Sequence, residues 1–175
     1  MKKEILAIAA AATLALTLSG CGSSGSSSST SGDKSVVTDS TKAADVGTFG
    51  TPLVAADGSA YTLSPLFSFT PKSSLGETDS ANQKFETFSI TVKNGSKAAL
   101  DLSGLIVASS TPTGECSDIL DGDSNLAGAP FDPIAVGATS TFKWALSCPG
   151  AAGDQVDIAV QVGGVNVIAV TGKLV

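Results

Sequence analysis

The sequence predicts an all-β protein whose folded part is an antiparallel β-sandwich of about seven or eight strands. From residue 47 onward, short runs of alternating apolar and polar residues recur, and turn-forming residues separate them about every 8–15 positions. In the same region we find no apolar spacing of an amphipathic helix. We therefore predict one domain over residues 47–175.

The first half of this domain contains two strand patterns. The segment 61–70 follows the turn-forming pair Asp57-Gly58, and Pro65 inside it predicts an edge strand or a bulged strand. The segment 88–92 alternates cleanly, so we expect its three apolar residues, which are Phe88, Ile90 and Val92, to face the core.

The next elements are predicted from turn chemistry. Asn94-Gly95 is a pair that favours a left-handed hairpin turn, so we expect a hairpin after the 88–92 strand. The segment 100–109 then predicts one or two short strands, broken at Gly104.

The second half of the domain alternates more regularly. The segment 141–148 places its large apolar residues on one face, and the segment 156–162 does the same with valine and isoleucine. Gly163-Gly164 predicts a tight turn, and the segment 165–170 predicts the returning strand.

Residues 1–20 have the organisation of an export signal. A short basic start containing Lys2 and Lys3 is followed by an apolar run that ends at Leu18. This run of about 14 residues is too short for the roughly 20 that a spanning helix requires. We predict a signal peptide over residues 1–20.

The sequence Leu18-Ser19-Gly20-Cys21 resembles the lipobox of bacterial lipoproteins, in which leucine and small residues precede a cysteine. The resemblance implies acylation of the Cys21 thiol, cleavage before Cys21, and attachment at the outer face of the cell membrane. Two or more acyl chains such as palmitate give a stable anchor. Residues 21–46 are rich in serine and glycine, and we predict a disordered tether.

Charge restricts the class of partner. Once the signal peptide with Lys2, Lys3 and Glu4 is removed, eight of the ten basic residues and fifteen of the sixteen acidic ones remain, and all eight are lysines. An acidic chain without arginine lacks the phosphate-binding groups that nucleic acids require. We expect no nucleic acid partner.

Cysteine and histidine counts limit the chemistry further. With Cys21 lipidated, Cys116 and Cys148 remain as an even pair in an oxidising compartment, which predicts a disulfide. The chain has no histidine, which excludes His-dependent nucleophilic triads and the common zinc and copper sites.

Two longer stretches resemble the telokin-like extracellular domains of bacterial lipoproteins. They are "FSITVKNGSKAALDLSGLIV" at 88–107 and "FDPIAVGATSTFKWAL" at 131–146, and the segment 45–49 resembles the opening of the same family. The resemblance implies an immunoglobulin-like sandwich of unassigned activity, with no catalytic residue to carry over. Because Trp144 lies just before Cys148, the cysteines do not have immunoglobulin spacing, and we expect a local staple between them.

An acidic stretch near the middle of the domain has calcium-loop spacing. Four oxygen-bearing side chains occupy the positions of such a loop: Asp121, Asp123, Asn125 and Asp132. Leu126 stands where the loop needs glycine, and Pro130 disrupts the following turn. An acidic surface turn is therefore the favoured interpretation, with calcium as the alternative and no other cofactor expected.

Two further site hypotheses compete with ordinary structural roles. Trp144 and Tyr61 could form a sugar-stacking platform, but Trp144 is in phase with a core-facing pattern. Four carboxylates in polar segments could supply a glycosidase-type pair: Glu77, Asp79, Glu86 and Glu115. The sequence gives no distance between any two of them, and we expect no enzyme.

These observations favour a non-catalytic module displayed on the cell surface that binds an envelope protein, a wall polymer or a small ligand through loops or a sheet face. The longest predicted loops, 71–83 and 111–133, are the expected recognition segments. One alternative is an accessory subunit that docks another envelope protein through a strand edge. The other is a wall-polymer hydrolase that works without histidine.

Overall fold

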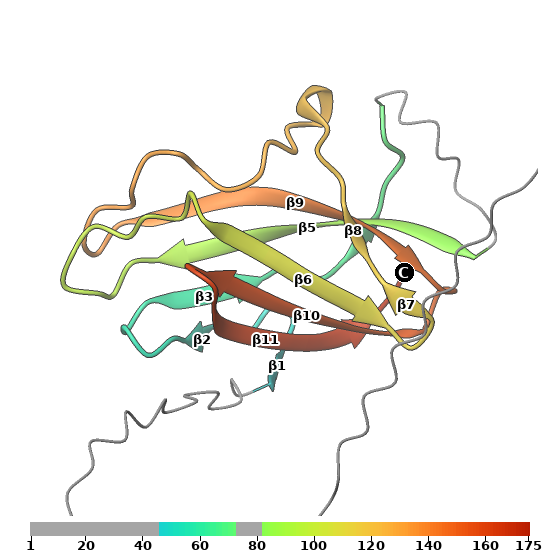
Figure 1. Ribbon diagram of the computed structural model, residues 1–175, viewed down its shortest axis with the longest axis horizontal. Coiled ribbons are helices and arrows are strands. Elements are labelled where there is room, and N and C mark those ends of the chain that lie inside the picture. Colours follow the sequence, from blue (N-terminus) through green and yellow to red (C-terminus); the bar gives the residue numbers. More distant parts are fainter. Residues whose placement is uncertain (1–45, 73–81) are drawn as a thin grey trace, which may run out of the picture. The chain divides into compact units, whose positions relative to one another are not determined.

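The computed structural model describes residues 46–72 and 82–175, and within them the chain forms two β-sheets packed face to face (Figure 1). The predicted signal peptide (1–20), Cys21 and the predicted tether up to residue 45 lie outside the described residues. Glu77 and Asp79 also lie outside them.

The first sheet has five strands in the order β1-β11-β10-β6-β7. These are β1 (Val46–Thr48), β11 (Val165–Lys173), β10 (Gln155–Val162), β6 (Leu105–Thr111) and β7 (Gly114–Glu115). Strand β1 pairs with β11 in parallel, whereas the other pairs are antiparallel.

The second sheet has the order β2-β3-β5-β9-β8, and β4 pairs with β5 beside this path. These strands are β2 (Leu53–Val54), β3 (Ala60–Leu63), β4 (Phe67–Ser68), β5 (Gln83–Lys93), β8 (Ser117–Asp118) and β9 (Thr139–Pro149). One short 3₁₀ helix, Gly122–Ser124, lies between β8 and β9. Two packed sheets confirm the predicted β-sandwich, and short edge strands such as β7 and β8 bring the described strands above the expected number.

The core lies between the inner faces of the two sheets. Strands β5 and β9 pair along their whole length, from Gln83 opposite Pro149 to Lys93 opposite Thr139. The predicted alternation is confirmed, because the inward residues of these strands and of β10 are buried: Phe88, Ile90, Val92, Trp144, Leu146, Cys148, Val156, Ile158 and Val160. Burial of these side chains contributes about 25 cal/mol per Å² of apolar surface removed from water.

The predicted hairpin at Asn94-Gly95 is wrong. Strand β5 pairs with β3, β4 and β9, and the chain leaves Lys93 to enter the other sheet at β6. The Asn94 side chain is buried, where its amide donates to the carbonyls of Ala98 (2.8 Å) and Ile134 (2.7 Å). Gly95 is needed for space, since a Cβ there would lie 2.1 Å from the carbonyl oxygen of Gly58.

Two predicted strands have different bounds in the structure. The 61–70 segment forms two separate strands, β3 and β4, on either side of Pro65, which has no N–H to continue the pairing. Strand β5 begins at Gln83, five residues before the predicted start at Phe88. Phe85 packs in a small outer cluster with Ile119, Leu126 and Ala145, so this end of the strand is buried on both faces and shows no alternation.

Other predicted turns are confirmed. Gly58 has a positive φ of 90° and its N–H donates to Ala55 between β2 and β3. Gly163 and Gly164 both have positive φ and join β10 to β11. Gly104 precedes the first residue of β6, and Leu100 forms an isolated bridge with Ile134.

We predict that Asn94→Ala lowers the free energy of unfolding by about 2–4 kcal/mol, because the buried Ile134 carbonyl and the partly buried Ala98 carbonyl lose their donor. Urea denaturation of the folded domain measures this change. Asn166→Ala, at an exposed position, is the matched control and should change stability by less than about 0.5 kcal/mol. Equal stability of both variants would show that the Asn94 hydrogen bonds to Ala98 and Ile134 do not stabilise the fold.

Candidate functional site

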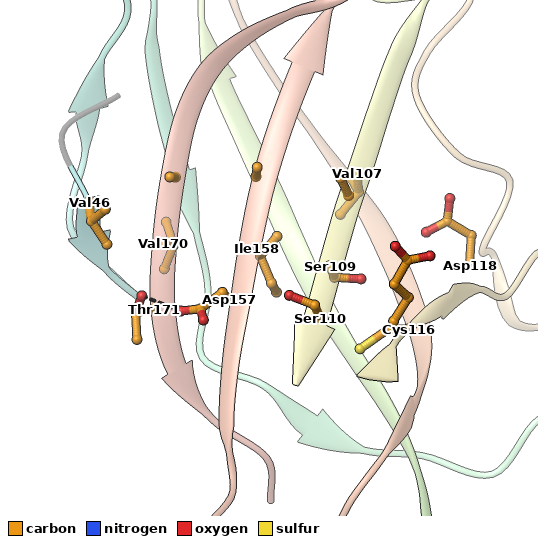
Figure 2. Close-up of a pocket in the computed structure, with 14 residues that line it drawn as sticks. Val46, Val107, Ser109, Ser110, Cys116, Asp118, Asp157, Ile158, Val170 and Thr171 are labelled. Carbon is orange, nitrogen blue, oxygen red and sulfur yellow. Dashed lines mark hydrogen bonds between the residues drawn. The ribbon is translucent and has the colours of Figure 1, made fainter. Parts of the chain in front are cut away.

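A hollow of about 460 Å³ lies on the outer face of the first sheet and extends from β1 to the segment that joins β7 and β8 (Figure 2). We call it the trough. Its volume falls within the range of about 300–1,000 Å³ that ligand sites occupy. It crosses the strands, because its lining residues come from β1, β11, β10, β6 and β7 in turn.

The floor of the trough is made of small apolar side chains in one cross-strand row. Ala108 of β6 lies opposite Ala159 of β10, and Ala159 lies opposite Ala169 of β11. Val46 of β1 continues the row, because it pairs with Ala169. These residues alternate with the buried core residues of their strands, so their side chains face outward. The row was not predicted, since single alanines carry no signal until the register aligns them.

A polar row lies beside the alanine row. Ser110, Asp157 and Thr171 are aligned across β6, β10 and β11. The Thr171 hydroxyl donates to Asp157 Oδ1 at 2.6 Å, and Gln155 Nε2 donates to both carboxylate oxygens. Asp157 is therefore held in a fixed position at the side of the trough.

One end of the trough is acidic and is built where the chain changes sheets. Strand β7 belongs to the first sheet and β8 to the second, and Cys116 lies between them. Glu115 on one side of Cys116 and Asp118 on the other both line the trough. We call this segment, 115–118, the acidic corner.

The disulfide fixes the acidic corner to both sheets. The Cys116 N–H donates to the Ser109 carbonyl in β6 at 2.9 Å, while its sulfur is bonded to Cys148 in β9. Cys116 therefore contacts the first sheet through its N–H and the second sheet through its sulfur. The neighbours of the two cysteines, Ser117 and Ser147, are paired in β8 and β9, so the bond joins adjacent chain segments and is local, as expected.

Asp118 also contacts the protein interior. The indole Nε1 of Trp144 donates to Asp118 Oδ1 at 2.8 Å. Although the residue as a whole is exposed, partial burial of its carboxyl group raises the pKa of Asp118 above its ordinary value, and the indole hydrogen bond opposes this shift. Asp118 thus bears a desolvation cost at this position.

Ser109 lines the trough at the same end and is only 9% exposed. Its side chain lies on the side of β6 that faces Cys116 and Asp118 (Figure 2). Its hydroxyl has no hydrogen-bond partner among the residues that the structure describes. A buried hydroxyl without a partner carries a desolvation cost.

The predicted calcium ligands do not converge. The Asp121 carboxylate is turned into the protein, where it accepts hydrogen bonds from the N–H groups of Lys72 and Asp123 and from the Ser124 hydroxyl. Asp123, Asn125 and Asp132 are exposed. Within the described ranges, no three acidic, histidine or cysteine side chains are grouped as a metal site requires. Asp121 acts as the cap of the 3₁₀ helix.

The structure separates the other predicted site residues. Trp144 and Tyr61 are both buried, so neither ring forms a platform for sugars, and burial raises the pKa of Tyr61 to about 12, helped by the charge of Asp57. Glu86 is fully buried among the core residues and accepts a hydrogen bond from the Val175 N–H. Glu115 is exposed in the acidic corner.

Comparison with solved structures supports the fold. The chain is similar to a Bacillus subtilis subsp. subtilis str. 168 protein provisionally classed as a lipoprotein (ycdA), with 17% identity and a TM-score of 0.50. The match covers 69% of this chain but 37% of the Bacillus protein, so the chain spans little more than a third of that protein. A second similar structure is an uncharacterized β-sandwich protein from Clostridium difficile 630, with 13% identity, a TM-score of 0.43, and coverage of 71% of this chain and 90% of that one.

No protein-family model matches the chain, and no curated protein matches its sequence. The telokin-like relationship therefore stays a prediction. In the parts of the chain that the structure describes, no helix has the length and apolar character needed to cross a membrane.

We predict that Cys116→Ala with Cys148→Ala lowers the free energy of unfolding by about 3–4 kcal/mol, the loop-closure contribution for a separation of 32 residues. Denaturation in urea with and without reductant measures the difference. Mass spectrometry of the native protein should show the pair oxidised. Alkylation of both cysteines without reductant would contradict the assignment.

Proposed function

We propose that this chain is a lipid-anchored, non-catalytic binding module of the bacterial envelope that takes its ligand in the trough. The observation that carries the proposal is the alanine floor, because it leaves an open hollow of about 460 Å³ on a sheet face instead of a surface filled by side chains. A rigid sheet also holds such a hollow in one shape when the ligand is absent. The ligand comes from an envelope protein or a wall polymer.

Anchoring rests on the lipobox-like sequence before Cys21. The similarity in fold to a Bacillus protein provisionally classed as a lipoprotein agrees with it. Acylation at Cys21 would hold the domain at the outer face of the cell membrane, and the serine- and glycine-rich segment after Cys21 would give it reach. The module would then meet partners in the envelope.

A second candidate is docking through a strand edge. Strand β9 pairs with β5 throughout. On its other edge, β8 pairs with Leu146 and Ser147 only, and the Ile119 N–H donates to the Ala145 carbonyl. Within the described part of the chain, Thr139–Lys143 therefore has no strand partner on that edge. Such an edge can accept a strand from another protein.

Filling the trough tests the proposed binding face. We expect Ala159→Phe to abolish capture of envelope components from a detergent extract, because the ring occupies the centre of the floor, while thermal stability stays nearly unchanged. Thr91→Phe on the second sheet is the matched control, since it adds the same ring outside the trough. Retained capture by Ala159→Phe would overturn the trough as the binding site and favour the β9 edge.

Replacing Cys21 tests the anchor. We expect Cys21→Ser to leave an unprocessed precursor or to release the protein into the medium, because serine provides no thiol for acylation. Fractionation of cells with intact-mass measurement of the product shows which occurs. A processed Cys21→Ser protein that stays in the membrane fraction as wild type does would contradict lipid anchoring.

A further inference from the structure

The charge of the trough has one sign. Three carboxylates line it, those of Glu115, Asp118 and Asp157, and the fourteen lining residues include no lysine. The lining as a whole is therefore an apolar floor with an acidic side and an acidic end. A ligand that is complementary to it carries positive charge and has a slim, apolar body.

The carboxylates keep acceptor capacity for a ligand. Each carboxylate offers about four acceptor positions. Asp118 accepts a hydrogen bond from the Trp144 indole, and Asp157 accepts from Thr171 and Gln155. An ammonium or guanidinium group entering at the acidic corner would supply donors to Glu115 and Asp118.

The dimensions favour an extended chain. The trough crosses five strands that lie roughly 4.8 Å apart, so its length is on the order of 19 Å. An extended peptide advances about 3.3 Å per residue, which places about six residues along it. The alanine row leaves room for a peptide backbone and short side chains, and the acidic corner lies at one end of that path.

We propose that the trough binds an extended basic segment of a partner protein, with its backbone over Ala108, Ala159 and Ala169 and a lysine or arginine side chain at the acidic corner. This inference rests on the proposed binding function and adds the chemistry of the partner. The segment lies across the strands of the first sheet, so its binding uses side-chain complementarity and not strand pairing.

Synthetic peptides test the partner chemistry on the full folded domain. The probes are six-residue peptides that alternate alanine with lysine, with glutamate or with serine, measured by calorimetry and by the fluorescence of Trp144, the only tryptophan. We expect the lysine peptide to bind, its affinity to fall as salt is raised, and the glutamate peptide not to bind. Equal binding of the lysine and serine peptides would overturn the proposal, as would no binding of the lysine peptide at about 1 mM.

Charge variants locate the contact. Glu115→Gln and Asp118→Asn should each weaken the lysine peptide about five- to tenfold, because each removes one negative charge from the acidic corner. Asp132→Asn, an exposed carboxylate outside the lining, is the matched control and should bind as wild type does. Glu115 is exposed, so its variant folds even if Asp118→Asn does not. A loss in Asp132→Asn equal to that in Glu115→Gln would overturn the assignment.

The two proposals fail in different ways. If Ala159→Phe abolishes capture of envelope components while the lysine peptide does not bind wild type, the trough is a binding site for another chemistry and the basic-segment inference is wrong. If Ala159→Phe captures the same components as wild type, the proposed binding face itself is wrong.

Discussion

The structure depends on the pairing of β5 with β9. These two strands run side by side over their whole length, and their inward side chains form the centre of the core. Strand β9 also holds the acidic corner, because Cys148 is bonded to Cys116 and the Trp144 indole donates to Asp118. One strand of the second sheet thus determines where two carboxylates lie relative to a hollow on the first sheet. Any loss of β5–β9 register would displace the core and the trough together.

The strands were predictable where one face is buried and the other is open. Alternation in β9 and β10 is a local consequence of such burial, so the sequence alone indicated which residues enter the core. The Asn94-Gly95 pair shows the limit of this reasoning. Its turn chemistry is that of a hairpin, but the Asn94 amide bonds carbonyls at Ala98 and Ile134, and the second of these is distant in sequence. A long-range hydrogen bond of this kind leaves no local pattern.

Of the candidate site, only the disulfide was predictable from the sequence. The pairing of Cys116 with Cys148 followed from an even cysteine count, but the position of Cys116 where the chain passes from the first sheet to the second did not. The trough depends on alanines from three strands that become neighbours through register, and two of these strands are far apart in sequence. Conversely, the acidic stretch around Asp121 had calcium-loop spacing, yet its one buried carboxylate accepts from the Lys72 N–H and from the Asp123 N–H and Ser124 hydroxyl of its own loop. Spacing alone does not give the direction of a side chain.

The alanine row makes the first sheet less stable than larger side chains at the same positions would make it. Alanine is depleted in strands, because it offers little surface to its cross-strand neighbours, and larger β-branched residues at the same outward positions would stabilise the pairing of β6, β10 and β11. Ile106 in β6 and Val165 in β11 are large, apolar and exposed, so strands of the first sheet tolerate such residues outside the alanine row. Small side chains in register at the centre therefore give the sheet something that stability does not require, namely depth. Depth beside Asp157 and the acidic corner provides shape and charge together, and a sheet face with both properties is suited to recognise a slim cationic chain.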